Sequence, residues 1–221
     1  MTVSTRARAF GLASLVGVTV LVPAAQGQSV TLNLNSPYQY GNGGEFVATP
    51  FSFPATPLSL TNDGNFQTFC VQSQVQYTPG GTYNVYFSPI GAPGGPALNE
   101  PTAYLYDLFI RGTLPVYDYL NAGPSRQSNA GALQYAIWQL EGQNTTGLAA
   151  NPDPALTTFY VNLATTNAAP GNFYGVSIMV LYTGDINNPT FAQNQLVELP
   201  APGSLGLLAV GGLMASRRRR A

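Results

Sequence analysis

Histidine and lysine are both missing from this chain of 221 residues, and cysteine occurs once, as Cys70. Without histidine, neither a Ser-His-Asp triad nor a Cys-His pair can be assembled, and the commonest metal ligand is also missing. A single cysteine cannot form an intramolecular disulfide, although secreted domains ordinarily use cysteines in pairs. The sequence therefore predicts a protein that is not an enzyme and has no cofactor and no metal site, and Cys70 needs another explanation.

Positive charge is also scarce between the two ends of the chain. Arg111 and Arg126 are the only basic residues from position 28 to 198, whereas all nine acidic residues lie there. The net charge of this segment is about −7, which the whole-chain value of −1 conceals. Binding to nucleic acid is therefore not expected, since a protein that binds the phosphate backbone needs a basic surface.

Residues 1–27 have the three parts of a secretory signal peptide. Arg6 and Arg8 precede an uncharged run from Phe10 to Val22, and Pro23 and several small residues follow it. The run is shorter than the roughly 20 apolar residues that span a bilayer, so it indicates a cleaved signal. We expect this segment to be removed and the protein to be exported.

The C-terminal residues 199–221 carry a second processing signal. Pro200, Ala201 and Pro202 precede an uncharged segment, residues 203–216, which four arginines follow: Arg217, Arg218, Arg219 and Arg220. This order resembles the PEP-CTERM sorting signal of exported bacterial proteins, in which the residue between the prolines is usually Glu.

The resemblance implies a short transmembrane helix with its arginine cluster on the cytoplasmic side, in keeping with the positive-inside rule. The body would then face outward, anchored transiently in the membrane by its C-terminus. An exosortase-type membrane protease would cut near the Pro-rich tripeptide, which places the product at the cell surface or in the extracellular space. A plain C-terminal membrane anchor is the alternative.

Residues 28–198 have the size of one extracellular domain. Alternating, β-branched and aromatic segments predict strands at 29–34, 45–53, 66–71, 82–87, 174–182 and 191–198. Helical spacing predicts helices near 99–112 and 129–141 and from Asp153 onward, with Asn99 and Asp153 as caps. The order predicts an α+β fold in which β-sandwich or barrel-like sheets carry a helical insert of about three helices.

Two polar side chains of this body are expected to be buried. Cys70 lies on a predicted strand between Phe69 and Val71. On the second predicted helix, Gln134 points between the directions of Ile137 and Trp138, inside the apolar arc. A buried amide is costly without a hydrogen-bond partner. The chain therefore hides one unpaired thiol and one inward glutamine.

Phe69-Cys70 and Gln134-Tyr135-Ala136-Ile137-Trp138 resemble the two motifs of the Cys-Gln thioester domains of surface adhesins, found mainly in Gram-positive bacteria. A Thr often precedes the Gln in that family, whereas this chain has Leu133. The resemblance implies a thioester between Cys70 and Gln134, in an environment that Phe69, Ala136, Ile137 and Trp138 form. In this chemistry the Cys70 thiolate attacks the Gln134 carbonyl, ammonia leaves, and an outside amine later takes the carbonyl.

Two functions stay open on the sequence. The first is an adhesion or matrix-attachment protein that captures an amine-bearing surface target through the thioester. The second is a non-reactive structural or glycan-associated protein of the cell surface or extracellular polysaccharide matrix, in which Cys70 and Gln134 are core residues. A hydrolase is a distant third, because no catalytic carboxylate pair can be assigned. Glu141 could position the amine, but a solvated acid at the helix end is the favoured interpretation.

Overall fold

The computed structural model describes residues 27–41, 43–93, 95–120 and 123–199. Residues 1–26 and 200–221, which hold most of both predicted signals, lie outside this part of the chain, and so do Pro200, Pro202 and Arg217–Arg220. The elements in chain order are β1 Ser29–Tyr40, β2 Gly43–Phe51, β3 Phe66–Thr68, β4 Gly81–Ser88, α1 Glu100–Ile110, α2 Pro124–Leu140, α3 Pro154–Asn167, β5 Val176–Thr183, β6 Thr190–Phe191 and β7 Gln195–Glu198.

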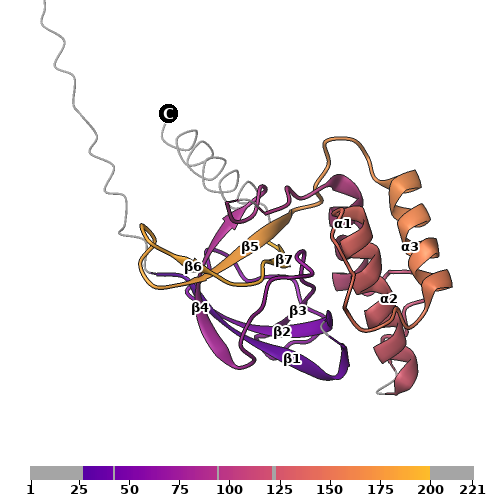
Figure 1. The fold of residues 1–221 in the computed structure, drawn as a ribbon, viewed down its shortest axis with the longest axis horizontal. Helices are drawn as coiled ribbons and strands as arrows, with labels where there is room; N and C mark the ends of the chain where they lie inside the picture. Colours follow the sequence, from indigo (N-terminus) through magenta and orange to yellow (C-terminus); the bar gives the residue numbers. More distant parts are fainter. Residues whose placement is uncertain (1–26, 42, 94, 121–122, 200–221) are drawn as a thin grey trace, which may run out of the picture.

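Seven strands form one antiparallel sheet in the order β3-β2-β1-β4-β5-β6, and β7 also pairs with β5. The sheet curls around itself, and the three helices pack together beside it (Figure 1). The predicted α+β class, with barrel-like strands and a helical insert, is confirmed.

The curled sheet closes where the chain after β3 meets β7. The amide of Leu196 donates to the carbonyl of Phe69 (3.0 Å), and the amide of Val71 donates to the carbonyl of Asn194 (3.1 Å). Between these two bonds, Cys70 and Gln195 face each other in an antiparallel bridge. We call residues 69–71 and 194–196 the seam, because they join the two ends of the curled sheet.

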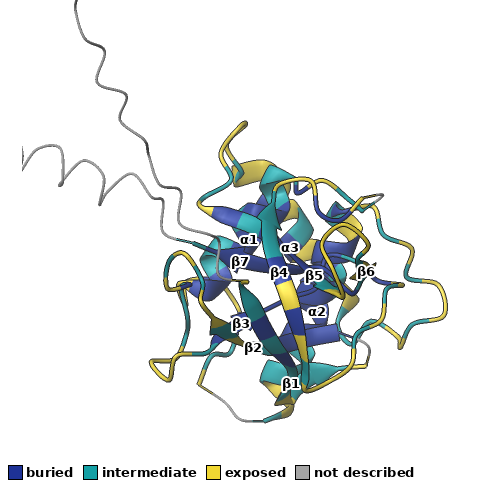
Figure 2. Ribbon diagram, turned by 90° about the vertical axis from the view of Figure 1, so that its left-hand side faces the viewer, coloured by how far each residue is buried: buried dark blue, intermediate teal, exposed yellow. Residues whose placement is uncertain are grey.

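The buried side chains form two cores that the sheet separates. One lies inside the curl and contains Val30, Leu32, Cys70 and Met179. The other lies between the sheet and the helices and includes the neighbours of Cys70, Phe69 and Val71, which point the opposite way along the strand. Figure 2 shows the matching alternation of buried and exposed residues along β4.

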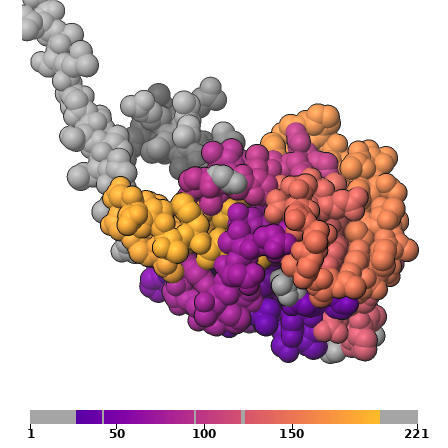
Figure 3. Space-filling model, in the orientation of Figure 1, coloured from indigo at the N-terminus to yellow at the C-terminus, as the bar shows by residue number. Residues whose placement is uncertain are grey.

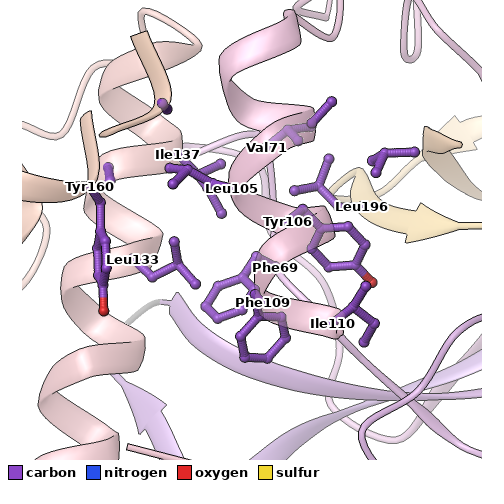
Figure 4. Packing of buried hydrophobic residues seen from close by; sticks show 14 of the residues in the cluster. Phe69, Val71, Leu105, Tyr106, Phe109, Ile110, Leu133, Ile137, Tyr160 and Leu196 are labelled. Carbon is purple, nitrogen blue, oxygen red and sulfur yellow. The ribbon is translucent and has the colours of Figure 1, made fainter. Parts of the chain in front are cut away.

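The helices cover one side of the molecule, and the strands form the other (Figure 3). In the core that they share with the sheet, the rings of Phe69 and Phe109 meet edge to face with centroids 4.9 Å apart, and Leu133 and Ile137 project from α2 beside them (Figure 4). The predicted caps are confirmed, since Asn99 accepts from the Thr102 amide and Asp153 accepts from the Leu156 amide.

The element boundaries differ from the sequence prediction at four places. Strand β3 ends at Thr68, three residues before the expected end of the strand 66–71, and Cys70 instead forms an isolated bridge outside the named strands. Helix α2 begins at Pro124, five residues before the expected start, in a polar stretch without helical apolar spacing. Strand β1 continues to Tyr40, with a shift of register between Leu34 and Gln39. The expected strand 191–198 is broken into β6 and β7. In each case contacts with distant parts of the chain decide the outcome, and local residue pattern does not show them.

Candidate functional site

Cys70 lies on the seam with its side chain inside the curled sheet, and it is fully buried. This position follows from strand alternation, because Phe69 and Val71 take the helix-facing side. The thiol is unpaired. An extended segment with apolar neighbours thus holds the Cys70 sulfur in the interior of the molecule.

Helix α2 has two inward faces. Leu133, Ala136 and Ile137 pack in the core between helices and sheet, whereas Trp138 belongs to the core inside the curl. Gln134 is four residues before Trp138, so the two side chains share a stripe of the helix. Only 1% of Gln134 is exposed. The predicted burial of Gln134 and Cys70 is therefore confirmed.

The Gln134 amide lies directly against Cys70. Its Oε1 accepts from the Cys70 amide (3.2 Å) and from Cys70 Sγ (3.3 Å), and its Nε2 donates to the Cys70 carbonyl (2.7 Å). The side-chain amide is bonded to both backbone groups of one residue, so it can neither rotate nor withdraw without losing these bonds. The amide of Cys70 also polarises the Gln134 carbonyl, as a donor in an oxyanion hole does.

The sulfur lies in a dry environment. Burial raises the pKa of the Cys70 thiol far above its usual range, and the Trp138 indole N–H nearby offsets only part of this rise. The indole nitrogen lies near the sulfur without a hydrogen bond of normal geometry. Among the described residues, no basic side chain contributes to the thiol's pKa. A free thiolate is therefore disfavoured here, which changes the chemistry expected from the sequence.

Gly43 leaves room for the Gln134 side chain. A Cβ atom at this glycine would lie 2.5 Å from Gln134 Cγ and 2.9 Å from Trp138 Cη2. Real Cβ atoms do not approach carbon so closely, so the start of β2 lies against α2 only because this residue has no side chain. The hairpin of β1 and β2 can therefore pack directly against the Gln134 and Trp138 side chains of α2.

Comparison with protein-family models, with curated proteins and with solved structures finds no match to this chain. The site is therefore interpreted from its own geometry.

The four residues predicted to surround the reactive pair are all buried. Trp138 lies beside the thiol in the inner core, whereas Phe69, Ala136 and Ile137 lie on the helix side of the seam. These three fix the strand and the helix from which the pair projects. Trp138 is the one that shares a core with the sulfur.

The interpretation of Glu141 as a solvated acid is wrong. Its carboxylate is buried, and its Oε1 accepts from the Asn99 amide at 3.4 Å. Burial raises the pKa of Glu141, and hydrogen bonds from Thr102 and Asn99 offset part of the rise. Because Glu141 turns toward the start of α1, it links two helices and does not face the thiol.

Two polar side chains near the sulfur were not identified from the sequence. Gln195 is fully buried and lies opposite Cys70 in the bridge, and its Oε1 has no hydrogen-bond partner. Tyr77 packs in the same inner core, and its buried hydroxyl also has no partner. Burial and then the neighbouring Cys70 raise the pKa of this hydroxyl. No local pattern marks either residue, since only the tertiary fold brings them to Cys70.

A second buried polar group has a structural role. The carboxylate of Glu45 accepts from Arg126 Nε (2.8 Å) and Nη2 (2.9 Å), from Asn35 Nδ2 (2.9 Å) and from the hydroxyl of Tyr117. Arg126 also lies over the Tyr38 ring, 4.0 Å from its centroid. Both charged groups of this ion pair are hydrogen-bonded within the protein, and the pair links β2 to the start of α2.

The residues that the structure describes contain no cluster of three or more possible metal ligands among His, Cys, Asp and Glu. Within the same residues, no helix is long and apolar enough to cross a membrane. The segment from 203 to 216, for which the sequence predicts a short transmembrane helix, lies outside them.

Proposed function

We propose that Cys70 and Gln134 form an internal thioester, and that the protein uses it to capture an amine-bearing target covalently at the cell surface. One observation carries this proposal. The Cys70 sulfur lies 3.3 Å from the carbonyl oxygen of a buried amide that the Cys70 backbone holds in place. Positioning of this kind raises the effective concentration of the two groups by many orders of magnitude.

The bond forms by loss of ammonia. The sulfur attacks Cδ of Gln134, the Sγ–Cδ bond forms and the Cδ–Nε2 bond breaks. The thiol proton moves to the departing nitrogen, which leaves as NH3. Because burial raises the pKa of the thiol, its proton passes to Oε1 along the existing contact as the sulfur attacks Cδ, and then passes from Oε1 to Nε2 as the Cδ–Nε2 bond breaks. The Cys70 amide stabilises the negative charge that develops on Oε1.

Capture consumes the bond once. The nitrogen of a target amine forms a bond to Cδ of Gln134, the Sγ–Cδ bond breaks, and one amine proton moves to the sulfur. The products are an amide between Gln134 and the target and a free Cys70 thiol. Burial protects the thioester until then, because water does not reach it. The protein is thus a single-use binder and not an enzyme.

The location of the protein outside the cell is part of the same proposal. A signal peptide and an exosortase-type sorting signal would place the acidic body outside the cell, at the surface or in the extracellular matrix. Single-use capture suits such a place, since it holds under flow and needs no cofactor. Adhesion to an amine-bearing surface target, or attachment within the matrix, is the function we infer.

Intact mass of the freshly purified, folded protein tests the bond. We expect the protein to be lighter than its calculated mass by one ammonia and its thiol to be unreactive toward alkylating reagents. A protein that begins at Gln28 can also lose ammonia by cyclisation of its N-terminal residue. The comparison is therefore with Cys70→Ala, which keeps Gln28 and loses only the thioester.

A matched control tests the glutamine. Gln67 is another buried amide, 4% exposed, and its side chain bonds to the loop at Leu60 and not to Cys70, so Gln67→Leu should keep the ammonia deficit while Gln134→Leu abolishes it. A wild-type protein of full mass, with a thiol that titrates freely after mild unfolding, would contradict the proposal.

The structural alternative has one observation in its favour. In the unreacted form, both polar atoms of the Gln134 amide have partners, so the pair could serve only to link α2 to the seam. In that case the protein would be a non-reactive structural or glycan-associated surface protein. Full mass in the wild type, with a loss of stability in Gln134→Leu, would establish this reading.

A further inference from the structure

A surface pocket of about 260 Å³ has Tyr77 and Gln193 in its wall, whereas Cys70 and Gln134 lie deeper and do not line it. Tyr77 lines it and also packs in the inner core with Cys70. Gln193 lines it from the other chain segment, and its Oε1 accepts from Gln195 Nε2 at 3.2 Å. The pocket wall is thus linked to the surroundings of the thiol in two ways, through Tyr77 in the inner core and through the hydrogen bond from Gln195 to Gln193.

The atoms along these links have unused hydrogen-bonding capacity. The hydroxyl of Tyr77 and Oε1 of Gln195 are both buried and without partners. Gln195 and Cys70 form a bridge flanked by the bonds of residues 69–196 and 71–194, which makes them a non-hydrogen-bonded pair whose side chains lie close on the same face. Leaving such groups unpaired costs free energy, and both atoms can accept a hydrogen bond from a ligand that enters from the pocket.

We propose that this pocket admits the attacking amine, and that Tyr77 and Gln195 hold the amine nitrogen against the thioester carbonyl. The inference rests on the proposed function. One N–H group of the arriving amine donates to the Tyr77 hydroxyl oxygen and the other donates to Gln195 Oε1, so the nitrogen lone pair stays free to attack Cδ of Gln134. The nitrogen then bonds to Cδ of Gln134, the Sγ–Cδ bond breaks, and the second amine proton moves to Cys70 Sγ.

The pocket also sets the class of substrate. Its lining contains no carboxylate and no cation, so nothing there selects an ammonium ion, and the neutral amine is the form that reacts. A hydroxyl group would need a general base, and neither histidine nor lysine occurs in the chain. The substrate is therefore a neutral primary amine, such as an unprotonated lysine side chain, and not a sugar hydroxyl of the polysaccharide matrix.

The first experiment measures the rate at which methylamine opens the preformed thioester, by intact mass. Tyr77→Phe should form the thioester and react about tenfold more slowly, the effect of one lost neutral hydrogen bond. The matched control is Tyr160→Phe, because the Tyr160 hydroxyl is also buried without a partner but lies in the core between helices and sheet. That variant should react at the wild-type rate. Glycerol should leave all three thioesters intact.

A second pair of variants tests the route. Gln76 lines the pocket with an exposed side chain, and Gln76→Trp should slow the reaction with n-butylamine at least tenfold. Ile90 is also exposed and lines a different pocket, so Ile90→Trp should leave the rate unchanged. In the absence of amine, the thioester of Tyr77→Phe should hydrolyse no faster than that of the wild type. Faster hydrolysis would show that the substitution loosens the site, whereas an unchanged rate shows that it removes a contact with the amine.

The outcomes are distinguishable. A wild-type protein of full mass overturns the proposed function itself. A wild-type thioester that Tyr77→Phe and Gln76→Trp open as fast as their controls overturns only the assignment of the pocket. If Tyr77→Phe fails to form the thioester, the ratio of rates between Gln76→Trp and Ile90→Trp decides, and equal rates reject the pocket.

Discussion

Gly43 gives the sharpest test of how tightly the fold sets the reactive pair. In Gly43→Ala the new methyl would lie 2.5 Å from Gln134 Cγ and 2.9 Å from Trp138 Cη2, about an ångström inside normal carbon contact. Both neighbours are buried, so neither can swing into solvent. Overpacking of this kind costs about 1–3 kcal/mol. Part of the relief must come from moving Gln134, and its carbonyl then leaves the position that the Cys70 amide holds.

The assay measures both the stability and the rate of thioester formation of each variant. Urea unfolding gives the loss of stability, and intact mass at intervals after refolding gives the rate of thioester formation. Gly131→Ala is the matched control, because its Cβ would lie 2.5 Å from Pro152 Cγ and 2.9 Å from Tyr40 Cγ, away from the amide. We expect similar losses of stability, and thioester formation at least tenfold slower in Gly43→Ala alone.

Equal rates of thioester formation in the two alanine variants would refute the reasoning. They would show that the amide tolerates displacement, and that its bonds to Cys70 do not control the reaction. A large loss of stability in Gly43→Ala without any change in rate would have the same meaning.

Three further predictions follow from other contacts. Arg126→Met strands a buried Glu45 carboxylate and should cost about 3–5 kcal/mol in urea unfolding, whereas adding Glu45→Gln should recover part of the loss; no recovery would contradict the pairing. Burial raises the pKa of Glu198 from 4.5 to about 7, with Arg111 opposing and Asp107 adding to the rise, so the fold holds this proton more tightly than the unfolded chain. Stability should therefore fall as pH rises from about 4.5 to about 7, by at most about 1.4 kcal/mol per pH unit, and Glu198→Gln should flatten this profile of urea midpoints; an unchanged slope would reject it. The thioester joins residues 64 apart and restricts the unfolded chain, so the bonded protein should be about 4 kcal/mol more stable than the same protein opened by methylamine. Equal urea midpoints of the two forms would contradict this stabilisation.

Much of the fold was predictable because its local signals are strong. Strand alternation on either side of Cys70 and helical spacing around Gln134 placed both residues in the interior, and the structure buries both. Asn99 and Asp153 marked two helix starts through cap chemistry that depends only on nearby backbone amides. Such features need no knowledge of distant contacts.

The rest depends on the tertiary fold. The seam that opposes Cys70 to Gln195 joins segments 125 positions apart, and no periodicity marks either side of it. Tyr77 lies in an irregular loop after the seam, where its reach to the thiol has no local signature. Glu141 looked solvated because it ends a helix, but the packing of α1 against that end buries it. The pair and the neighbouring Trp138 could be proposed from the sequence, whereas Gln195 and Tyr77 could not.

The absence of lysine and of histidine can both be explained by the proposed thioester between Cys70 and Gln134. A thioester has two competitors for its carbonyl, water and any amine on the same protein. Burial excludes the first, since Cys70 and Gln134 are nearly inaccessible to solvent. The absence of lysine removes the second, apart from the α-amino group at the N-terminus, so that copies of the protein do not link to one another through side chains. The absence of histidine withholds the base that would let hydroxyls compete. In the proposed function, what remains able to react is an external amine that enters by the pocket of Tyr77, and this selectivity suits the single-use capture that we propose outside the cell.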